Sequence, residues 1–351
     1  MDNKKIRVAI THGDTNGIGY ELIFKAFADP EMLELCTPVI YGSPKVASYH
    51  RKALASETPF TIISSTDDIR DGKLNLLTCF DEEVKVELGV PTEEAAAAGA
   101  KALKKAIEDQ KEGRFDTLVL APVVQNAEVK RQGLVVLMDP NLRIALANAD
   151  STMKEAVGKV TKENILKKAD IFFSLLKRDL RIGNPRVAVL ALNPNADGTE
   201  ETEAILPAIK ELTEKGKQAF GPYPAADFFG SGKYQVFDGI LAMYHDQGAI
   251  PFRTLSSPDS IVCVAGLPVP CTMPLDATCH ENAGKGVADE NSFRQAIYTA
   301  IDICRNRRNF DEPLANPLPK LFHEKRDDSE KVRFSVPKKQ ENAPTEDESQ
   351  E

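Results

Sequence analysis

Residues 237–248 read Phe-Asp-Gly-Ile-Leu-Ala-Met-Tyr-His-Asp-Gln-Gly, an apolar run that ends in a group of polar residues. The run predicts a buried β-strand, and His245 and Asp246 follow its carboxyl end. In α/β proteins, ligands bind beyond the carboxyl ends of strands. His245 could therefore ligate a metal or transfer a proton, with Asp246 as a second ligand or as the group that orients the imidazole. The alternative is a histidine that only forms a hydrogen bond at the end of a strand.

The same pattern recurs along the chain, where short apolar runs alternate with longer helical patterns. The helical patterns cover residues 92–113, 161–176, 205–216 and 293–304, and Thr92 and Thr161 are suited to cap the first two. This alternation predicts an α/β fold with a mostly parallel sheet covered by helices on both faces. The other predicted strands are Ile6–Ile10, Pro38–Tyr41, Leu74–Thr78, Asp116–Ala121, Leu134–Met138, Arg186–Leu192 and Ile261–Ala265.

The composition excludes several classes of protein. The 351 residues carry a formal net charge of −9, with a sequence pI near 5.3, which argues against a nucleic-acid partner because such proteins present a basic face. No apolar run approaches the roughly 20 residues of a membrane span, so we expect no membrane partner. No signal-peptide pattern precedes the first predicted strand, and the six cysteines are scattered. We therefore expect a cytoplasmic protein with reduced thiols.

The last part of the chain differs from the rest. Residues 324–351 include nine acidic and six basic residues and no Ile or Leu. A segment of this composition buries too little apolar surface to offset the entropy lost on ordering. We therefore expect residues 323–351 to form a disordered acidic tail.

A glycine-rich segment, Ile10–Glu21, connects the first predicted strand to a predicted helix. Loops of this kind present backbone N–H groups and the amino end of a helix to an anion. The segment lacks the Gly-x-Gly-x-x-Gly dinucleotide fingerprint. A tight turn that needs glycine only for its backbone angles is the alternative.

Other polar segments carry weaker signals. Residues 193–198 have the composition of an ordinary turn. His280 and Glu281 are adjacent, and neighbouring side chains do not converge easily on one metal ion. His50 lies beside Arg51 and Lys52, which indicates a solvent-facing position on a helix.

Taken in order, these segments resemble the family of 4-hydroxythreonine-4-phosphate dehydrogenases of vitamin B6 biosynthesis. The resemblance extends from about Ile6 to Arg307 and is most specific at residues 242–248, Ala-Met-Tyr-His-Asp-Gln-Gly. It implies that residues 1–322 form two α/β domains with mostly parallel sheets and an interdomain cleft, similar to isocitrate and isopropylmalate dehydrogenases. It also implies a homodimer whose site takes residues from both subunits. Further matched positions are Gly13, Asp14, Gly17, Ile18, Gly19, Glu21, Leu192–Pro194, Gly266–Pro268, Ala283, Gly284 and Gly286.

The resemblance implies a reaction and a metal site. The reaction is NAD-dependent oxidation of a phosphorylated hydroxy-amino acid followed by decarboxylation, on the route to pyridoxal phosphate. In the family, three histidines hold a divalent metal such as Zn²⁺, Mg²⁺ or Mn²⁺. This chain retains His245, while Asp150 and Asn195 stand at the other two positions. Carboxylate and amide oxygens also bind divalent cations, so the expected metal ligands are His245, Asp150 and Asn195, with His245 and Asp246 as the catalytic residues.

The resemblance also assigns the binding residues. Arg253 would hold the substrate phosphate, and Asp14 would contact the substrate with Thr11 and Asn16 nearby. The residues expected to bind NAD are Asp276, Thr278 and Gly284.

Several family positions are replaced in this chain. The family segment Gly-His-Thr-Glu is missing, and Gln125, Val262 and Cys271 stand where the family has Lys, Asn and Arg. The scaffold positions match while the positions that carry chemistry do not. We therefore hypothesise an impaired or redirected dehydrogenase on a retained fold. The alternative is a non-catalytic paralogue that acts as a binding or regulatory subunit.

Overall fold

A computed structural model describes residues 5–80, 83–122, 127–275 and 279–316. One 12-stranded sheet runs through the molecule in the order β3-β4-β2-β1-β5-β12-β11-β6-β7-β10-β8-β9. The strands are β1 (Ile6–Thr11), β2 (Cys36–Gly42), β3 (Thr61–Ile63), β4 (Asn75–Thr78), β5 (Thr117–Leu120), β6 (Leu134–Asp139), β7 (Leu142–Leu146), β8 (Arg186–Leu190), β9 (Gln218–Tyr223), β10 (Gly239–Ala242), β11 (Ile261–Ala265) and β12 (Cys271–Pro274).

The sheet consists of two parallel blocks joined by an antiparallel centre. Strands β3, β4, β2, β1, β5 and β12 pair in parallel, as do β7, β10, β8 and β9. The pairs β12–β11, β11–β6 and β6–β7 are antiparallel. Because these three reversals separate the blocks, the two blocks run in opposite directions. The predicted α/β class with a mostly parallel sheet is confirmed, whereas the apolar runs of the sequence did not predict β3, β7, β9 and β12.

Helices cover both faces of this sheet. They are α1 (Gly19–Ala26), α2 (Met32–Leu35), α3 (Pro44–Ala53), α4 (Glu93–Lys111), α5 (Ala127–Gln132), α6 (Met153–Gly158), α7 (Lys162–Ser174), α8 (Leu206–Glu214), α9 (Ala225–Gly230), α10 (His245–Leu255) and α11 (Asn291–Ala315). The predicted caps are confirmed: the side chains of Thr92 and Thr161 accept hydrogen bonds from the amides of Ala95 and Asn164. No helix in the described ranges is long and apolar enough to cross a membrane.

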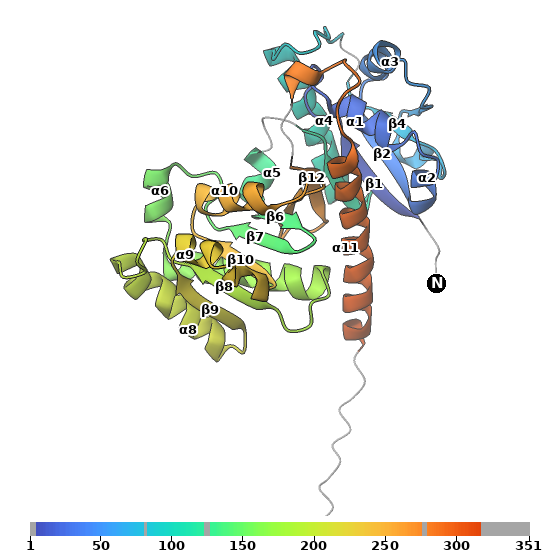
Figure 1. Cartoon of the computed structure of the whole chain (residues 1–351). Coiled ribbons are helices and arrows are strands. Elements are labelled where there is room, and N and C mark those ends of the chain that lie inside the picture. The colour runs from blue at the N-terminus through green and yellow to red at the C-terminus, as the bar shows by residue number, and fades with distance from the viewer. Residues whose placement is uncertain (1–4, 81–82, 123–126, 276–278, 317–351) are drawn as a thin grey trace, which may run out of the picture.

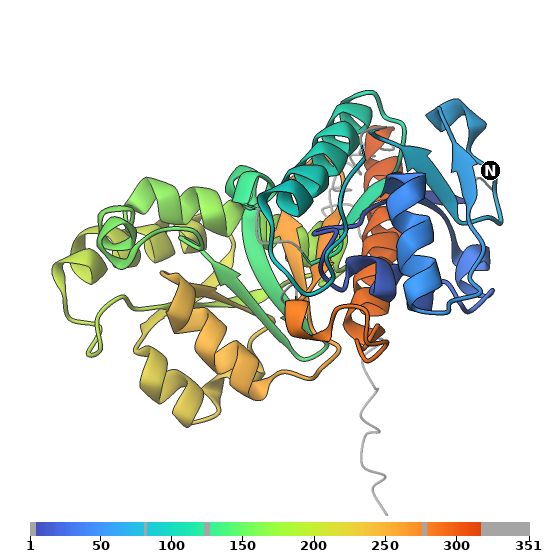
Figure 2. The ribbon, with the colours of Figure 1, turned by 90° about the horizontal axis from the view of Figure 1, so that it is seen from above.

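Two lobes lie side by side (Figures 1 and 2). One contains β1, β2 and β4 with α1 to α4, and the other contains β7 to β10 with α6, α8, α9 and α10. The two lobes share the continuous sheet. The predicted division of residues 1–322 into two domains stays a prediction, and the predicted tail at 323–351 lies outside the described residues.

The core has two halves because neighbouring residues of a strand point to opposite faces. In β6, Val136 packs into one half together with α1, α7, α8 and α11, while Val135 and Leu137 pack into the other half with α4, α9 and α10. On the first face, α11 lies on β5, β11 and β12, and α7 lies on β6. On the second face, α4 lies on β1 and β2, and α10 lies on β7 and β10. The short helix α5 lies on the central strand β6 of this second face, between α4 and α10.

The glycine-rich segment packs tightly against α4. A Cβ atom built on Gly99 would stand 2.3 Å from the carbonyl oxygen of Gly13, and one on Gly19 would stand 1.9 Å from that of His12. Glycine is therefore needed in α1 and α4 to let backbone approach backbone, which fixes the loop between them.

Replacing Gly99 with alanine should destabilise the protein by about 1–3 kcal/mol, because the added methyl group clashes with the carbonyl of Gly13. Alanine normally stabilises a helix interior by about 1 kcal/mol relative to glycine. Gly230→Ala in α9 is the matched control, since nothing lies within 4 Å of its Cβ position. Urea unfolding of both variants gives the comparison, and equal stability of G99A and G230A would contradict the role assigned to the close approach.

Candidate functional site

His245 and Asp246 occupy the first turn of α10, directly after β10. Both side chains are more than half exposed, and Nδ1 of His245 lies 2.7 Å from a carboxylate oxygen of Asp246. With the proton on Nδ1, the imidazole donates to Asp246 and leaves Nε2 as an acceptor. The predicted pairing of the two residues is therefore present, on an accessible surface.

The two residues that follow have structural roles. The Oε1 atom of Gln247 accepts a hydrogen bond from the amide of Met243 at 2.8 Å, and its Nε2 atom donates to the carbonyl of Ala191 at the end of β8. A Cβ on Gly248 would stand 2.6 Å from Leu146 of β7. Gln247 and Gly248 therefore hold α10 against three neighbouring strands, and so they fix the position of His245.

A cavity of about 290 Å³ lies beside His245. We call it the His245 cavity. It brings together His245 and Arg253 of α10, Asp150 after β7, and Lys130 of α5. It occupies the space over the central antiparallel strands, with the ends of β5 and β12 on one side and those of β7 and β10 on the other. The remaining lining residues are Pro122, Val135, Leu137, Leu146, Ala149, Ala249, Val262, Met273, Pro274 and Leu275.

The predicted metal ligands are only partly brought together. His245 and Asp150 line the same cavity, whereas Asn195 is exposed in the turn after β8 and lies outside that lining. Within the described ranges, no three His, Cys, Asp or Glu side chains are placed to hold one metal ion. Coordination of a metal by His245, Asp150 and Asn195 together stays a prediction.

Of the predicted substrate residues, Arg253 is in the His245 cavity and Asp14 is not. Arg253 is exposed and donates to the carbonyl of Leu275 at 3.3 Å. Asp14 is buried, accepts a hydrogen bond from the amide of Asn16, and lies 3.2 Å from Nε2 of His280. No pattern in the sequence predicts the contact between Asp14 and His280, because 266 positions separate them. Contact of Asp14 with substrate stays a prediction.

Gly284 is the predicted NAD-binding residue that the structure describes, and its backbone has a φ of +73°. A Cβ on it would stand 2.5 Å from Leu88, and it is not part of the His245 cavity. The other two residues, Asp276 and Thr278, lie outside the described residues. Binding of NAD by these residues stays a prediction.

Two histidines are buried at the glycine-rich segment: His12 belongs to it, and His50 of α3 packs against it. His12 stacks on Tyr20 with a centroid distance of 5.0 Å. His50 is also buried, with Nε2 2.7 Å from the carbonyl oxygen of Thr15, so the predicted solvent-facing position is wrong. It faces inward because it packs against the ring of Tyr20 at 4.9 Å. Burial lowers the pKa of His12 to about 3, with a further contribution from His50, and burial also lowers the pKa of His50.

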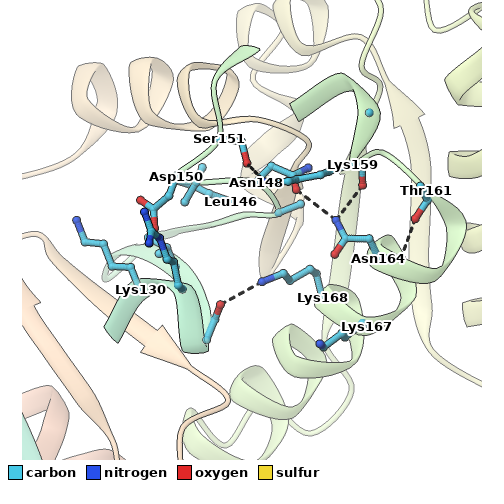
Figure 3. A pocket seen from close by; sticks show the side chains of 16 residues that line it. Lys130, Leu146, Asn148, Asp150, Ser151, Lys159, Thr161, Asn164, Lys167 and Lys168 are labelled. Atoms are coloured by element: carbon cyan, nitrogen blue, oxygen red, sulfur yellow. Dashed lines mark hydrogen bonds between the residues drawn. The ribbon is translucent and has the colours of Figure 1, made fainter. Parts of the chain in front are cut away.

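A group of lysines beside Asp150 was not identified from the sequence. It lines a second, larger pocket with Lys159, Lys167 and Lys168 on one side (Figure 3). Lysines along a helix normally indicate a solvent-exposed face, and the sequence carries no signal that this face borders a pocket.

The chain is similar in sequence and in structure to one family of known proteins along most of its length. The family model "Pyridoxal phosphate biosynthetic protein PdxA" matches residues 34–134 and 125–300. A 4-hydroxythreonine-4-phosphate dehydrogenase of Bacteroides thetaiotaomicron is 48% identical over 96% of this chain and 99% of its own length. One from a Sulfurihydrogenibium species is 31% identical over 86% of this chain and 100% of its own length. The crystal structure of a protein of that name from Burkholderia phymatum is 25% identical, has a TM-score of 0.67, and covers 86% of this chain and 99% of its own.

The buried His12 predicts a pH dependence of stability. Between about pH 6.5 and pH 3, the unfolded chain binds a proton at this residue that the folded protein does not bind. The free energy of unfolding should therefore fall as the pH falls, by up to about 1.4 kcal/mol per pH unit. His12→Phe should reduce this slope between about pH 6.5 and pH 5, measured by urea unfolding at several pH values. His50 contributes in the same direction, so part of the slope should remain. An unchanged slope in H12F would show that His12 is protonated in the folded protein.

Proposed function

The chain belongs to the PdxA family of pyridoxal phosphate biosynthetic proteins, and we propose that it is a dehydrogenase of this family whose activity is impaired or redirected. The proposed substrate class is a phosphorylated hydroxy-amino acid, which is oxidised with NAD and then decarboxylated. The observation that carries the proposal is the His245 cavity, which places His245, Asp150 and Arg253 around one space of about 290 Å³. We also propose that the protein acts as a homodimer in the cytoplasm.

Each polar group of the cavity has a proposed task. Arg253 presents a guanidinium group that can hold an anionic end of the substrate. The Nε2 atom of His245 can accept the proton of the substrate hydroxyl, while Asp246 holds the imidazole through Nδ1. NAD, when bound, supplies the hydride acceptor. The carbinol carbon loses its hydrogen as hydride, the hydroxyl proton moves to His245, and the resulting ketone β to a carboxylate loses carbon dioxide.

The weaker donor set is the reason to expect low activity. Asp150 and Asn195 stand at two positions where the family has histidine, and Asn195 is not among the residues that line the cavity. Polarisation of the hydroxyl by a metal is worth several kcal/mol in enzymes that use it. We therefore assign no step to a metal in this chain. We propose that the proton moves to His245 from a hydroxyl that is less polarised than in enzymes with such a metal, which makes the reaction slower.

A non-catalytic paralogue is the second candidate, and the same donor set favours it. Such a protein would keep the fold and the cavity and would bind a ligand or an intact relative without turning over substrate. The distinguishing measurement is activity together with metal content.

We expect NADH formation from 4-phosphohydroxythreonine, in the presence of Zn²⁺, Mg²⁺ or Mn²⁺, to be slower than about 1 s⁻¹. Stopped-flow or steady-state absorbance of NADH measures it. A turnover of 1 s⁻¹ or more would contradict impairment with this substrate. No turnover and no stoichiometric metal would support the paralogue and rule out the dehydrogenase.

His245→Gln should lower any turnover by roughly 100-fold or more, because the proton acceptor is lost. Asp246→Asn should cause a smaller loss, since it leaves the imidazole in place and replaces the charged acceptor at Nδ1 with a neutral one. Asp227→Asn, at an exposed position in α9, is the matched control and should leave turnover unchanged. Equal rates for H245Q and the unmodified protein would show that His245 does not transfer the proton.

A further inference from the structure

A pocket of about 540 Å³ opens beside the His245 cavity. We call it the lysine pocket. Its cationic side chains are Lys130, Arg131, Lys159, Lys167 and Lys168. Its volume lies within the range of small-molecule sites, about 300–1,000 Å³. The two spaces share Lys130 and Asp150 as part of their walls.

The charge of this pocket is opposite to that of the chain. Five cationic side chains face one carboxylate, Asp150, in a protein with a net charge of −9. None of the five forms an ion pair with a carboxylate in the described part of the chain. Elsewhere on the surface several lysines form ion pairs, for example Lys215 with Glu211 at 2.7 Å. An unpaired cluster in a concave site concentrates positive potential there.

The charged form of Lys168 is destabilised by its position in the lysine pocket. It is partly buried, and its ammonium group donates to the carbonyl of Gly133 at 3.1 Å (Figure 3). Burial lowers its pKa, and the adjacent Lys167 lowers it further. An anion in the pocket would relieve both effects, because a negative charge stabilises the charged form of each lysine.

The walls of the pocket are rigid enough to hold a ligand. Asn148 donates to the carbonyl of Met243 at 2.9 Å, which ties the end of β7 to the end of β10. Asn164 of α7 donates to Asn148 at 3.2 Å and to the carbonyl of Lys159 at 2.9 Å. Lys159 in turn donates to Ser151 at 2.8 Å. Helix α7, which carries Lys167 and Lys168, and the segment that carries Lys159 are therefore hydrogen-bonded to each other and to the ends of β7 and β10.

We propose that the lysine pocket binds the phosphoryl group of a phosphorylated small molecule, at a position separate from Arg253. A phosphoryl group carries about −1.5 to −2 charges and offers three acceptor oxygens, which several ammonium groups can share. Lysine binds such groups as a point charge. The remaining volume accommodates the organic part of the molecule. The proposal concerns binding alone, so its test does not depend on whether the protein has dehydrogenase activity.

The test is calorimetric titration of the full chain with inorganic phosphate and, separately, with O-phosphothreonine as a phosphate ester, in a phosphate-free buffer. Both probes should bind, and both affinities should fall with added salt. Lys167→Met combined with Lys168→Met should weaken both by at least tenfold. Lys104→Met with Lys111→Met, two exposed lysines on α4, is the charge-matched control and should retain affinity within about twofold.

Two further variants keep the test independent of folding. Lys167→Met alone changes an exposed side chain and should weaken binding, while Lys168→Arg keeps the charge and should retain most of it. Equal affinity of the unmodified protein and K167M/K168M for either probe would overturn the proposal. Absence of saturable binding by the unmodified protein, or binding of inorganic phosphate without the ester, would also overturn it.

Discussion

The reversal of strand direction at the centre of the sheet is the constraint on which the rest of the structure depends. Because the pairs β12–β11, β11–β6 and β6–β7 are antiparallel, the strands of one parallel block run opposite to those of the other. Helices that follow parallel strands cover their own block, so α4 and α10 lie apart on one face, with only the short helix α5 on β6 between them in the described part of the chain. The His245 cavity is the result, and its walls come from both blocks.

The fold class could be predicted from the sequence because apolar runs and helical patterns alternate along the chain. The antiparallel centre of the sheet could not be predicted, since a buried strand such as β11 has the same composition in either orientation. Short strands such as β3, whose residues are partly exposed, carry too little pattern to be identified. The burial of His50 could not be predicted from the residues next to it. Arg51 and Lys52 indicate an exposed helix, yet a helix turns about 100° per residue, so adjacent positions face different directions.

The most specific motif, residues 242–248, combines two kinds of requirement. Gln247 and Gly248 are needed for packing, because they join α10 to β7, β8 and β10. His245 and Asp246 are exposed and serve no packing role that the structure shows. An intact motif is therefore evidence for the fold as much as for the chemistry. A chain can belong to the family by its fold while the residues of its site differ. The placement of Asn195 and of the lysine pocket depends on loops, which a single sequence does not position.

The continuous sheet has a mechanical consequence. Proteins with two lobes joined by a flexible linker close by rotation about a few residues. Here the backbone hydrogen bonds of β5, β12, β11, β6 and β7 run without interruption from one lobe to the other, and the 25-residue helix α11 lies across β1, β5, β11 and β12. Relative motion of the lobes must therefore bend or twist a braced sheet, which favours small amplitudes. The width of the His245 cavity is accordingly tied to the pairing of the central strands, because its walls come from both blocks of one sheet.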